Sequence, residues 1–199
     1  MVKGINIGVI GIQGAISEHI SSMKKALNET KITGNVIIVR QVSDLENIDG
    51  LVLPGGESTT ISRFLFKSGL HNKILKLIEE NNLPIMGTCA GCVLLAKETA
   101  KENDDVKLLK LMDMQVKRNA FGRQKESFEK EIYIKDFDKG YNAVFIRAPI
   151  IEKIWGKCKP LAKIDNNIIM TKQENLLAIS FHPELTDDLR IHKYFLKMI

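Results

Sequence analysis

A cysteine lies between two glycines in the segment Gly87-Thr88-Cys89-Ala90-Gly91, directly after the apolar run Leu83-Pro84-Ile85-Met86. A buried strand that ends in Gly-x-nucleophile-x-Gly and leads into a helix forms a nucleophile elbow, because the glycines permit a sharp turn that holds the nucleophile up at the end of the strand. The helix N-terminus behind such a turn lowers the pKa of a thiol. Cys89 is therefore the first candidate nucleophile.

A base for this nucleophile, and a group to orient the base, are both present in His182-Pro183-Glu184. Pro183 biases His182 towards an extended conformation, in which residues two apart point the same way, so the Glu184 carboxylate is expected to reach the His182 ring. The segment follows an apolar run at 177–181, which predicts that it lies at a strand's end, as Cys89 does. Cys89, His182 and Glu184 thus form a candidate nucleophile–base–orienter triad.

The loop Leu53-Pro54-Gly55-Gly56-Glu57-Ser58-Thr59-Thr60 is a third candidate element of a site. Two glycines between a strand and a helix allow the backbone to approach a ligand closely, with amide N–H groups facing a developing negative charge. The N–H groups of Gly56 and Ala90 would together form an oxyanion hole. A plain strand–turn–helix connection, capped by Ser58 or Thr59, is the simpler explanation of the loop when it is taken alone. The loop is not a P-loop, because it lacks the Gly-Lys-Ser/Thr ending.

Two other chemistries compete for the cysteines. Cys89 and Cys92 form a C-x-x-C pair, which also occurs at helix starts in thiol oxidoreductases. A redox pair explains neither the two glycines around Cys89 nor His-Pro-Glu, and the apolar surroundings of Cys92 predict a core position. No second pair of ligands has a spacing suited to zinc, so we expect neither a metal nor a cofactor. Structural roles are the default for the remaining residues of these types, which are Cys158, His19, His71 and His192.

Composition limits the class of protein. The chain has 199 residues, of which 44% are hydrophobic and 27% charged, which predicts one soluble domain over 1–199. The net charge of +5 is spread along the chain and aromatic residues are only 6%, which argues against nucleic-acid binding. No apolar run approaches the ~20 residues of a membrane span. Three cysteines do not indicate a disulfide framework, and no signal peptide is recognised, so a cytoplasmic protein without a membrane partner is expected.

Strand-like and helix-like segments alternate over the first half of the chain. Apolar runs at 5–10, 36–39, 51–53 and 83–86 predict buried parallel strands. Apolar residues at helical spacing predict helices between them, marked by Ile16, Ile20, Met23 and Leu27, by Ile61, Phe64 and Leu65, and by Leu70, Ile74, Leu77 and Ile78. This rhythm predicts an α/β fold with a doubly wound parallel sheet and functional loops at the carboxyl ends of the strands.

The second half of the chain changes character. Short apolar segments at 132–134, 143–146, 167–170 and 176–179 follow one another without long helices between them, which predicts an antiparallel extension of the sheet. A last helix is expected after Thr186 as N-cap, with Asp187 and Asp188 in its first turn and with Leu189, Phe195 and Leu196 on its apolar face. The predicted architecture is therefore a three-layer fold with helices on both faces of a mostly parallel sheet.

Taken together, these motifs resemble the class I, or triad, glutamine amidotransferases. More narrowly, the chain is similar to the glutaminase subunits of pyridoxal 5′-phosphate synthase. The similarity extends over almost the whole chain, in blocks at 8–14, 53–60, 87–91, 118–124 (Arg-Asn-Ala-Phe-Gly-Arg-Gln), 145–149 (Phe-Ile-Arg-Ala-Pro) and 180–186. The blocks at 118–124 and 145–149 are not expected of the whole class, which makes the resemblance specific. Cys92 departs from it, because the family commonly has an aliphatic residue there.

The resemblance implies hydrolysis of L-glutamine to glutamate and ammonia through a γ-glutamyl thioester on Cys89. His182 would move protons to the leaving ammonia and from the attacking water, and Glu184 would orient His182. The residues that match the family's glutamine-binding positions are Gly56, Glu57, Ser58, Arg118, Ile146 and Arg147. Gln13 resembles a residue near the oxyanion loop.

The resemblance also implies a partner, a separate (β/α)₈-barrel synthase subunit that receives the ammonia in a large hetero-oligomer. The nearest alternative is a triad glutaminase that supplies another acceptor, such as the one in histidine biosynthesis. A non-catalytic binding module that has kept the fold is a second alternative, and a thiol oxidoreductase is a third. The candidate triad argues against the last two.

Overall fold

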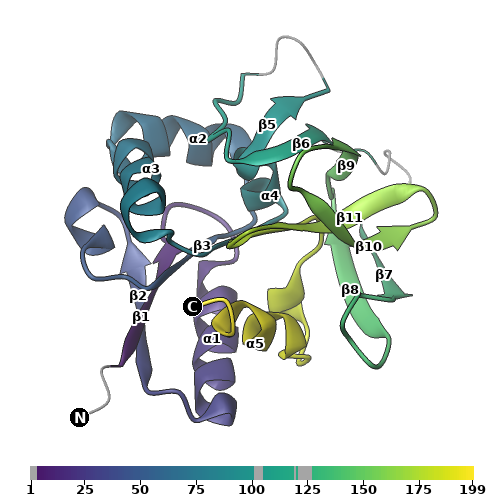
Figure 1. The fold of residues 1–199 in the computed structure, drawn as a ribbon, viewed down its shortest axis with the longest axis horizontal. Helices are drawn as coiled ribbons and strands as arrows, with labels where there is room; N and C mark the ends of the chain where they lie inside the picture. Colours follow the sequence, from purple (N-terminus) through teal and green to yellow (C-terminus); the bar gives the residue numbers. More distant parts are fainter. Residues whose placement is uncertain (1–3, 101–104, 119, 121–126) are drawn as a thin grey trace.

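A computed structural model describes residues 4–100, 105–118, 120 and 127–199. Within these residues, ten strands form one mixed sheet, and helices cover both of its faces (Figure 1). Nine of the strands follow the order β2-β1-β3-β4-β12-β11-β9-β6-β5, and β10 pairs with β11. The prediction of an α/β fold with a large, mostly parallel sheet is confirmed.

The parallel part of the sheet consists of strands from the first half of the chain and of β12 (Leu176–Ile179). The first-half strands are β1 (Ile5–Ile10), β2 (Gly34–Val39), β3 (Gly50–Leu53) and β4 (Ile85–Thr88). Every residue of β3, β4 and β12 is buried, as expected for central strands covered on both faces. The carboxyl ends of β3, β4 and β12 therefore meet at one edge of the sheet, where loops can form a site.

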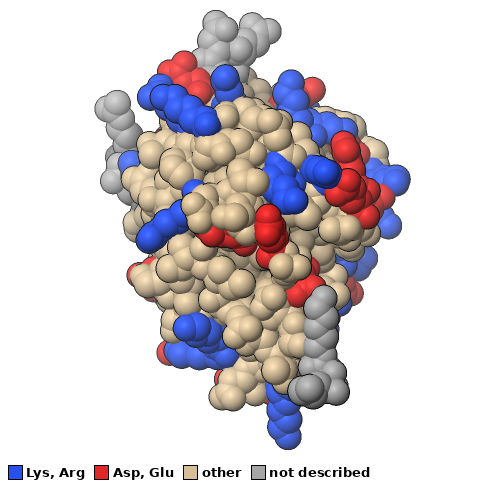
Figure 2. Space-filling model, turned by 90° about the vertical axis from the view of Figure 1, so that its left-hand side faces the viewer, with Lys and Arg blue, Asp and Glu red and all other residues tan. Residues whose placement is uncertain are grey.

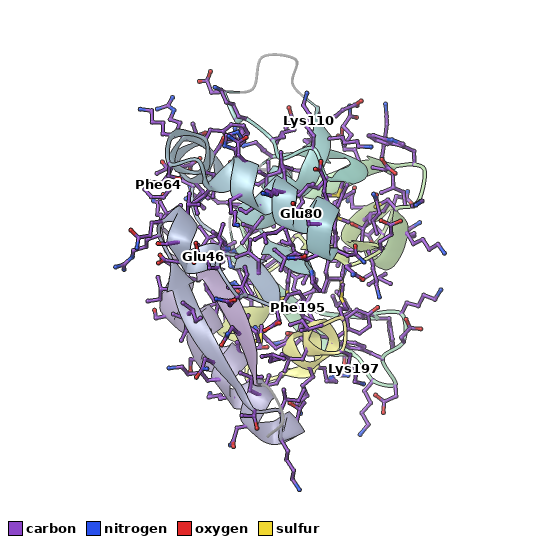
Figure 3. All side chains as sticks on the ribbon, turned by 60° about the vertical axis from the view of Figure 1, so that its left-hand side comes forward. Glu46, Phe64, Glu80, Lys110, Phe195 and Lys197 are labelled. Carbon is purple, nitrogen blue, oxygen red and sulfur yellow. The ribbon has the colours of Figure 1, made fainter. Side chains whose placement is uncertain are left out.

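The helices form a layer on each face of the sheet. In Figure 1, α2 (Ser58–Lys67), α3 (Leu70–Asn81) and α4 (Ala90–Leu95) lie on one side, and α1 (Ile16–Thr30) and α5 (Arg190–Leu196) lie together on the other. Each layer covers its own core cluster of buried apolar side chains. Phe195, labelled on α5 in Figure 3, is fully buried, whereas Lys197 at the end of this helix is exposed. Burial of one apolar stripe on each helix stabilises this arrangement.

The second half of the chain extends the sheet with mainly antiparallel strands, as predicted. The strands of this extension are β5 (Ala96–Thr99), which pairs parallel with β6 (Met112–Lys117), together with β9 (Ile150–Ile154), β10 (Lys159–Ile164) and β11 (Asn167–Gln173). Two details differ from the expectation. β7 (Ser127–Ile132) and β8 (Tyr141–Ile146) form a separate two-stranded sheet, and β12 pairs parallel with β4 although it is antiparallel to β11. Short apolar runs predict strands but carry no information about which neighbour each strand joins.

The last helix begins later than the sequence predicts. α5 starts at Arg190. Instead of capping a helix, the Thr186 hydroxyl donates a hydrogen bond to the Pro183 carbonyl and lies 3.2 Å from the Tyr141 hydroxyl. Leu189 is the N-cap residue, and the carboxylate of Asp188 before it accepts a hydrogen bond of 3.0 Å from the backbone N–H of Arg190. The prediction of Thr186 as N-cap was therefore wrong, because a buried tyrosine competes for its hydroxyl.

The surface carries both signs of charge. On the face shown in Figure 2, lysine and arginine side chains lie at separate places with acidic side chains among them. None of the helices in the described part of the chain is long and apolar enough to span a membrane.

Candidate active site

The turn at Cys89 has the backbone of a nucleophile elbow. β4 ends at Thr88 and α4 begins at Ala90, and Cys89 between them has φ 48° and ψ −101°. A positive φ is rare for a residue with a side chain and is retained where the surrounding structure enforces it. A side chain at Gly91 would overlap the carbonyl oxygen of Leu53 in β3, so only glycine allows the start of α4 to pack this closely against the sheet.

His182 and Glu184 lie beside this elbow because β12 lies next to β4 in the sheet. The parallel register aligns Thr88 with Ile179, and Ile179 precedes His182 by three residues. The His182 ring contacts Glu184 through Nδ1, which lies 2.6 Å from Oε1, and both side chains are largely buried. The contact does not arise as predicted. Residues 183–185 form a 3₁₀ turn, η3 (Pro183–Leu185), and not an extended segment, so Glu184 reaches the ring across a turn.

The electrostatics of this pair favour a charged imidazole. Burial alone lowers the pKa of His182, but hydrogen bonds with Cys89 and Glu184 and the charges of both residues outweigh burial and raise this pKa to about 10. Burial alone raises the pKa of Glu184, yet the neighbouring His19 and His182 rings hold it below its usual value. At neutral pH, Glu184 is therefore a carboxylate and His182 carries a proton that it can give to a reacting group.

The loop after β3 closes against the same imidazole. A Cβ atom at Gly55 would lie 2.5 Å from Cε1 of His182 and 3.4 Å from Cβ of Cys89. The loop backbone thus packs this closely against the His182 ring and Cys89 only because Gly55 has no side chain. The next residue, Gly56, has φ 153°, and its Cα region packs against the carbonyl oxygen of Gln13. The glycine loop is therefore part of the site's wall as well as a strand–helix connection.

A cavity of about 530 Å³ opens in front of Cys89 and His182, large enough for a small organic substrate. Most of the residues with a predicted role line it, namely Gly56, Glu57, Ser58, Cys89, Ala90, Arg118, Ile146, Arg147 and His182. Glu184 lies behind His182 in the interior. Gln13, Gly14, Ala15, Gly55, Val93 and Pro149 complete the lining.

Two arginines give this cavity a positive wall. The guanidinium of Arg118 lies 3.3 Å from a carboxylate oxygen of Glu57, and Arg147 follows β8 with φ 42°. The backbone N–H of His182 donates a 2.8 Å hydrogen bond to the Val144 carbonyl of β8, which holds the β7–β8 hairpin beside the triad. The carbonyl oxygen of Ile146 lies 3.9 Å from Sγ of Cys89. Asn119 and 121–124 of the Arg-Asn-Ala-Phe-Gly-Arg-Gln block lie outside the described residues.

The competing chemistries gain no geometric support. All three cysteines are free and buried. Burial raises the pKa of the Cys92 thiol, which makes it a poor nucleophile for disulfide exchange. Among the described residues, no group of three or more His, Cys, Asp or Glu side chains is arranged to hold a metal ion.

One buried residue near the triad was given only a structural role by sequence reasoning. His19 on α1 has its Nε2 atom 2.9 Å from the hydroxyl oxygen of Thr88 and 3.3 Å from Oε2 of Glu184. Its side chain is fully buried. Its position in the sequence offered no signal, because the contact forms only when α1 packs across the ends of β4 and η3.

Comparisons with known proteins show which family the chain belongs to. Residues 9–199 match the model of the SNO glutamine amidotransferase family, and the chain belongs to this family. It is 49% identical over 196 residues, 98% of this chain and 99% of the relative, to a protein of Pyrococcus furiosus named "Pyridoxal 5'-phosphate synthase subunit PdxT". A protein of the same name from Methanococcoides burtonii is 48% identical over 96% of this chain and 98% of its own length.

Solved structures show the same fold. A crystal structure of a glutamine amidotransferase superposes with a TM-score of 0.85 at 38% identity, covering 96% of this chain and 97% of the other. A glutamine amidotransferase from Thermotoga maritima shares the fold at 13% identity, with a TM-score of 0.61 over 96% of this chain and 80% of its own.

Proposed function

We propose that this chain is a single glutaminase domain that hydrolyses L-glutamine to L-glutamate and ammonia for a separate pyridoxal 5′-phosphate synthase subunit. The observation that carries the proposal is the contact of His182 with both Cys89 and Glu184 at the edge of the cavity. Family membership and the names of the relatives support the choice of glutamine and of the synthase.

In the first step, the Cys89 thiolate attacks the amide carbon of glutamine. The carbonyl oxygen gains negative charge, which the backbone N–H groups of Gly56 and Ala90 would stabilise. Protonated His182 gives its proton to the amide nitrogen, the carbon–nitrogen bond breaks, and ammonia leaves a γ-glutamyl thioester on Cys89. Because Glu184 accepts a hydrogen bond from Nδ1, the other ring nitrogen of His182 serves the reacting atoms.

In the second step, His182 takes a proton from water, which attacks the thioester carbon. The thioester breaks, glutamate leaves, and Cys89 is again a thiolate beside protonated His182. Arg118 and Arg147 are the candidates for the α-carboxylate of glutamine, since a guanidinium binds a carboxylate through paired hydrogen bonds. Glu57, Ser58 and Ile146 complete the proposed substrate-binding set.

The partner would be a (β/α)₈-barrel subunit in a large hetero-oligomer in the cytoplasm. We expect the free subunit to be poorly active, because a peptide between two glycines reorients easily and docking can select the orientation that stabilises the oxyanion.

The test is glutamate release from L-glutamine by the wild type and Cys89→Ala, each with and without the cognate synthase subunit. We expect hydrolysis that the synthase stimulates and that Cys89→Ala abolishes. Stimulation by the synthase of histidine biosynthesis instead would favour the alternative acceptor. If the isolated chain hydrolysed glutamine as fast as the complex, the activation model would be wrong.

A further inference from the structure

The carboxylate of Glu184 has a second neighbour besides His182. Its Oε1 atom contacts His182, whereas Oε2 is buried and has no hydrogen-bond partner among the residues that the structure describes. The His19 ring lies beside Oε2, with its Nε2 atom 3.3 Å away. A buried carboxylate oxygen without a donor is costly, so it matters which nitrogen of the His19 ring carries the proton.

The surroundings of His19 determine which ring nitrogen carries the proton. An unprotonated Nε2 would direct its lone pair towards a carboxylate oxygen, which is repulsive, so the proton belongs on Nε2. Burial lowers the pKa of His19, which favours the neutral ring. The other nitrogen, Nδ1, is buried without a partner in the described structure, as suits a nitrogen without a proton. The Nε2–H group then faces two oxygens, those of Thr88 and Glu184.

These contacts join three separate segments. Thr88 directly precedes the nucleophile, Glu184 orients the base, and His19 lies on α1, which begins just after Gln13, Gly14 and Ala15 of the cavity wall. All three side chains have 0–5% of their surface exposed. One imidazole therefore links the elbow, the acid of the triad and the first helix.

We propose that His19 is a positioning residue that keeps Glu184 ionised and correctly oriented towards His182, using an Nε2–H group shared with Thr88. The inference rests on the proposed function, because it assigns His19 a role through the triad. Three further ionisable groups lie near this ring, namely His182, Glu18 and His192.

His192 provides a matched control. It lies on α5 with its ring centre 6.0 Å from that of His19 and is also fully buried. Neither of its ring nitrogens has a hydrogen-bond partner among the described residues. Burial lowers its pKa to about 3, so His192 is also neutral. Its replacement removes a buried imidazole from the same pocket without removing a donor to Glu184.

The experiment compares His19→Leu, His19→Gln and His192→Leu in the full chain. Glutamine supplies an amide N–H close to the position of Nε2, whereas leucine supplies none. The first readout is kcat and KM for glutamine hydrolysis in the presence of the synthase subunit. We expect His19→Leu to lower kcat about ten- to a hundredfold with little change in KM. His19→Gln should recover most of this loss, and His192→Leu should behave as the wild type.

The second readout is the pH dependence of Cys89 alkylation by iodoacetamide, measured on the Cys89 peptide by mass spectrometry. Loss of the Nε2–H group raises the pKa of Glu184, so on acidification Glu184 takes up a proton, and ceases to stabilise the His182 imidazolium, at a higher pH. The acid limb of the alkylation profile should therefore move up by roughly one pH unit. Three results would overturn the inference: an unchanged acid limb in His19→Leu, an equal shift of that limb in His192→Leu, or a failure of His19→Gln to restore both readouts. This readout needs no turnover. A chain that shows these shifts but releases no glutamate would contradict the proposed function and leave the role of His19 intact.

Discussion

The backbone N–H of Cys89 donates a 2.8 Å hydrogen bond to the carbonyl oxygen of Ile179. This bond continues the parallel pairing of β4 with β12 one residue past the end of β4, and it holds Cys89 in register with a chain segment that reaches His182 three residues later. Sheet pairing rather than a local motif therefore determines the distance between the thiol and its base.

Replacement of the two cysteines of the C-x-x-C pair should separate their roles. Cys89→Ala should reduce glutamine hydrolysis by at least about a thousandfold, because the covalent step is lost. Cys92→Ala should retain most of the activity, since Cys92 is a buried thiol with a raised pKa. The measurement is glutamate release in the presence of the synthase. Equal loss in both variants would instead support a redox pair.

Glu184→Gln should impair catalysis without loss of the fold. The amide cannot stabilise a protonated His182, so we expect kcat to fall by about 10³–10⁴-fold, as for the acid of other triads. In this variant, the pH dependence of Cys89 alkylation should no longer indicate an ion pair between the Cys89 thiolate and the His182 imidazolium. Aspartate is the matched comparison, because Glu184→Asp keeps the charge and should retain more activity. Similar losses in the two variants would contradict a role for the charge.

The stability of the protein should depend on pH through His182. The pKa of this residue is about 10 in the folded chain, above the value of ~6.5 of an unfolded one. Its contribution is therefore fully present below pH ~6.5 and is lost as the pH rises through about 10. We expect the difference in unfolding free energy between the wild type and His182→Asn to shrink over this interval, measured by urea unfolding at several pH values. A constant difference would contradict the raised pKa.

A methyl group at Gly55 should displace the catalytic ring. Its Cβ would lie 2.5 Å from Cε1 of His182, which forces the imidazole or the loop to move. We expect Gly55→Ala to lower kcat on the order of a hundredfold with the fold retained. Gly4→Ala is the control, because its Cβ would meet nothing closer than the Thr33 carbonyl oxygen at 3.2 Å. Wild-type kcat in Gly55→Ala would show that the loop and the ring are not in contact.

The two arginines of the cavity should affect substrate binding more than chemistry. Arg118→Ala and Arg147→Ala should each raise KM for glutamine by about ten- to a hundredfold, with a smaller change in kcat, because they would bind the α-carboxylate in both the ground and transition states. Arg63→Ala on the exposed side of α2 is the control for loss of charge. A fall in kcat at unchanged KM would assign the arginines to the chemical step instead.

Local patterns were sufficient to predict most of the fold and the residue types of the site. The apolar runs predicted β1, β3, β4 and the helices between them, because buried parallel strands and amphipathic helices leave periodic traces in a sequence. The pairing of β7 with β8 alone, and of β12 with β4, was not predictable in this way. The partners of a strand are determined by long-range packing, on which short apolar runs give no information.

The same distinction applies to the site. Residue types and spacing selected Cys89, His182 and Glu184, since the elbow glycines and His-Pro-Glu are contiguous motifs. The tertiary structure alone decided that Gly55 lies against the His182 ring and Cys89, and that His19 lies against Glu184. These contacts join segments tens of residues or more apart, and they exist only after the helices have packed on the sheet. Contiguous sequence can therefore specify which groups do chemistry, whereas their mutual distances and protonation states follow from burial and packing.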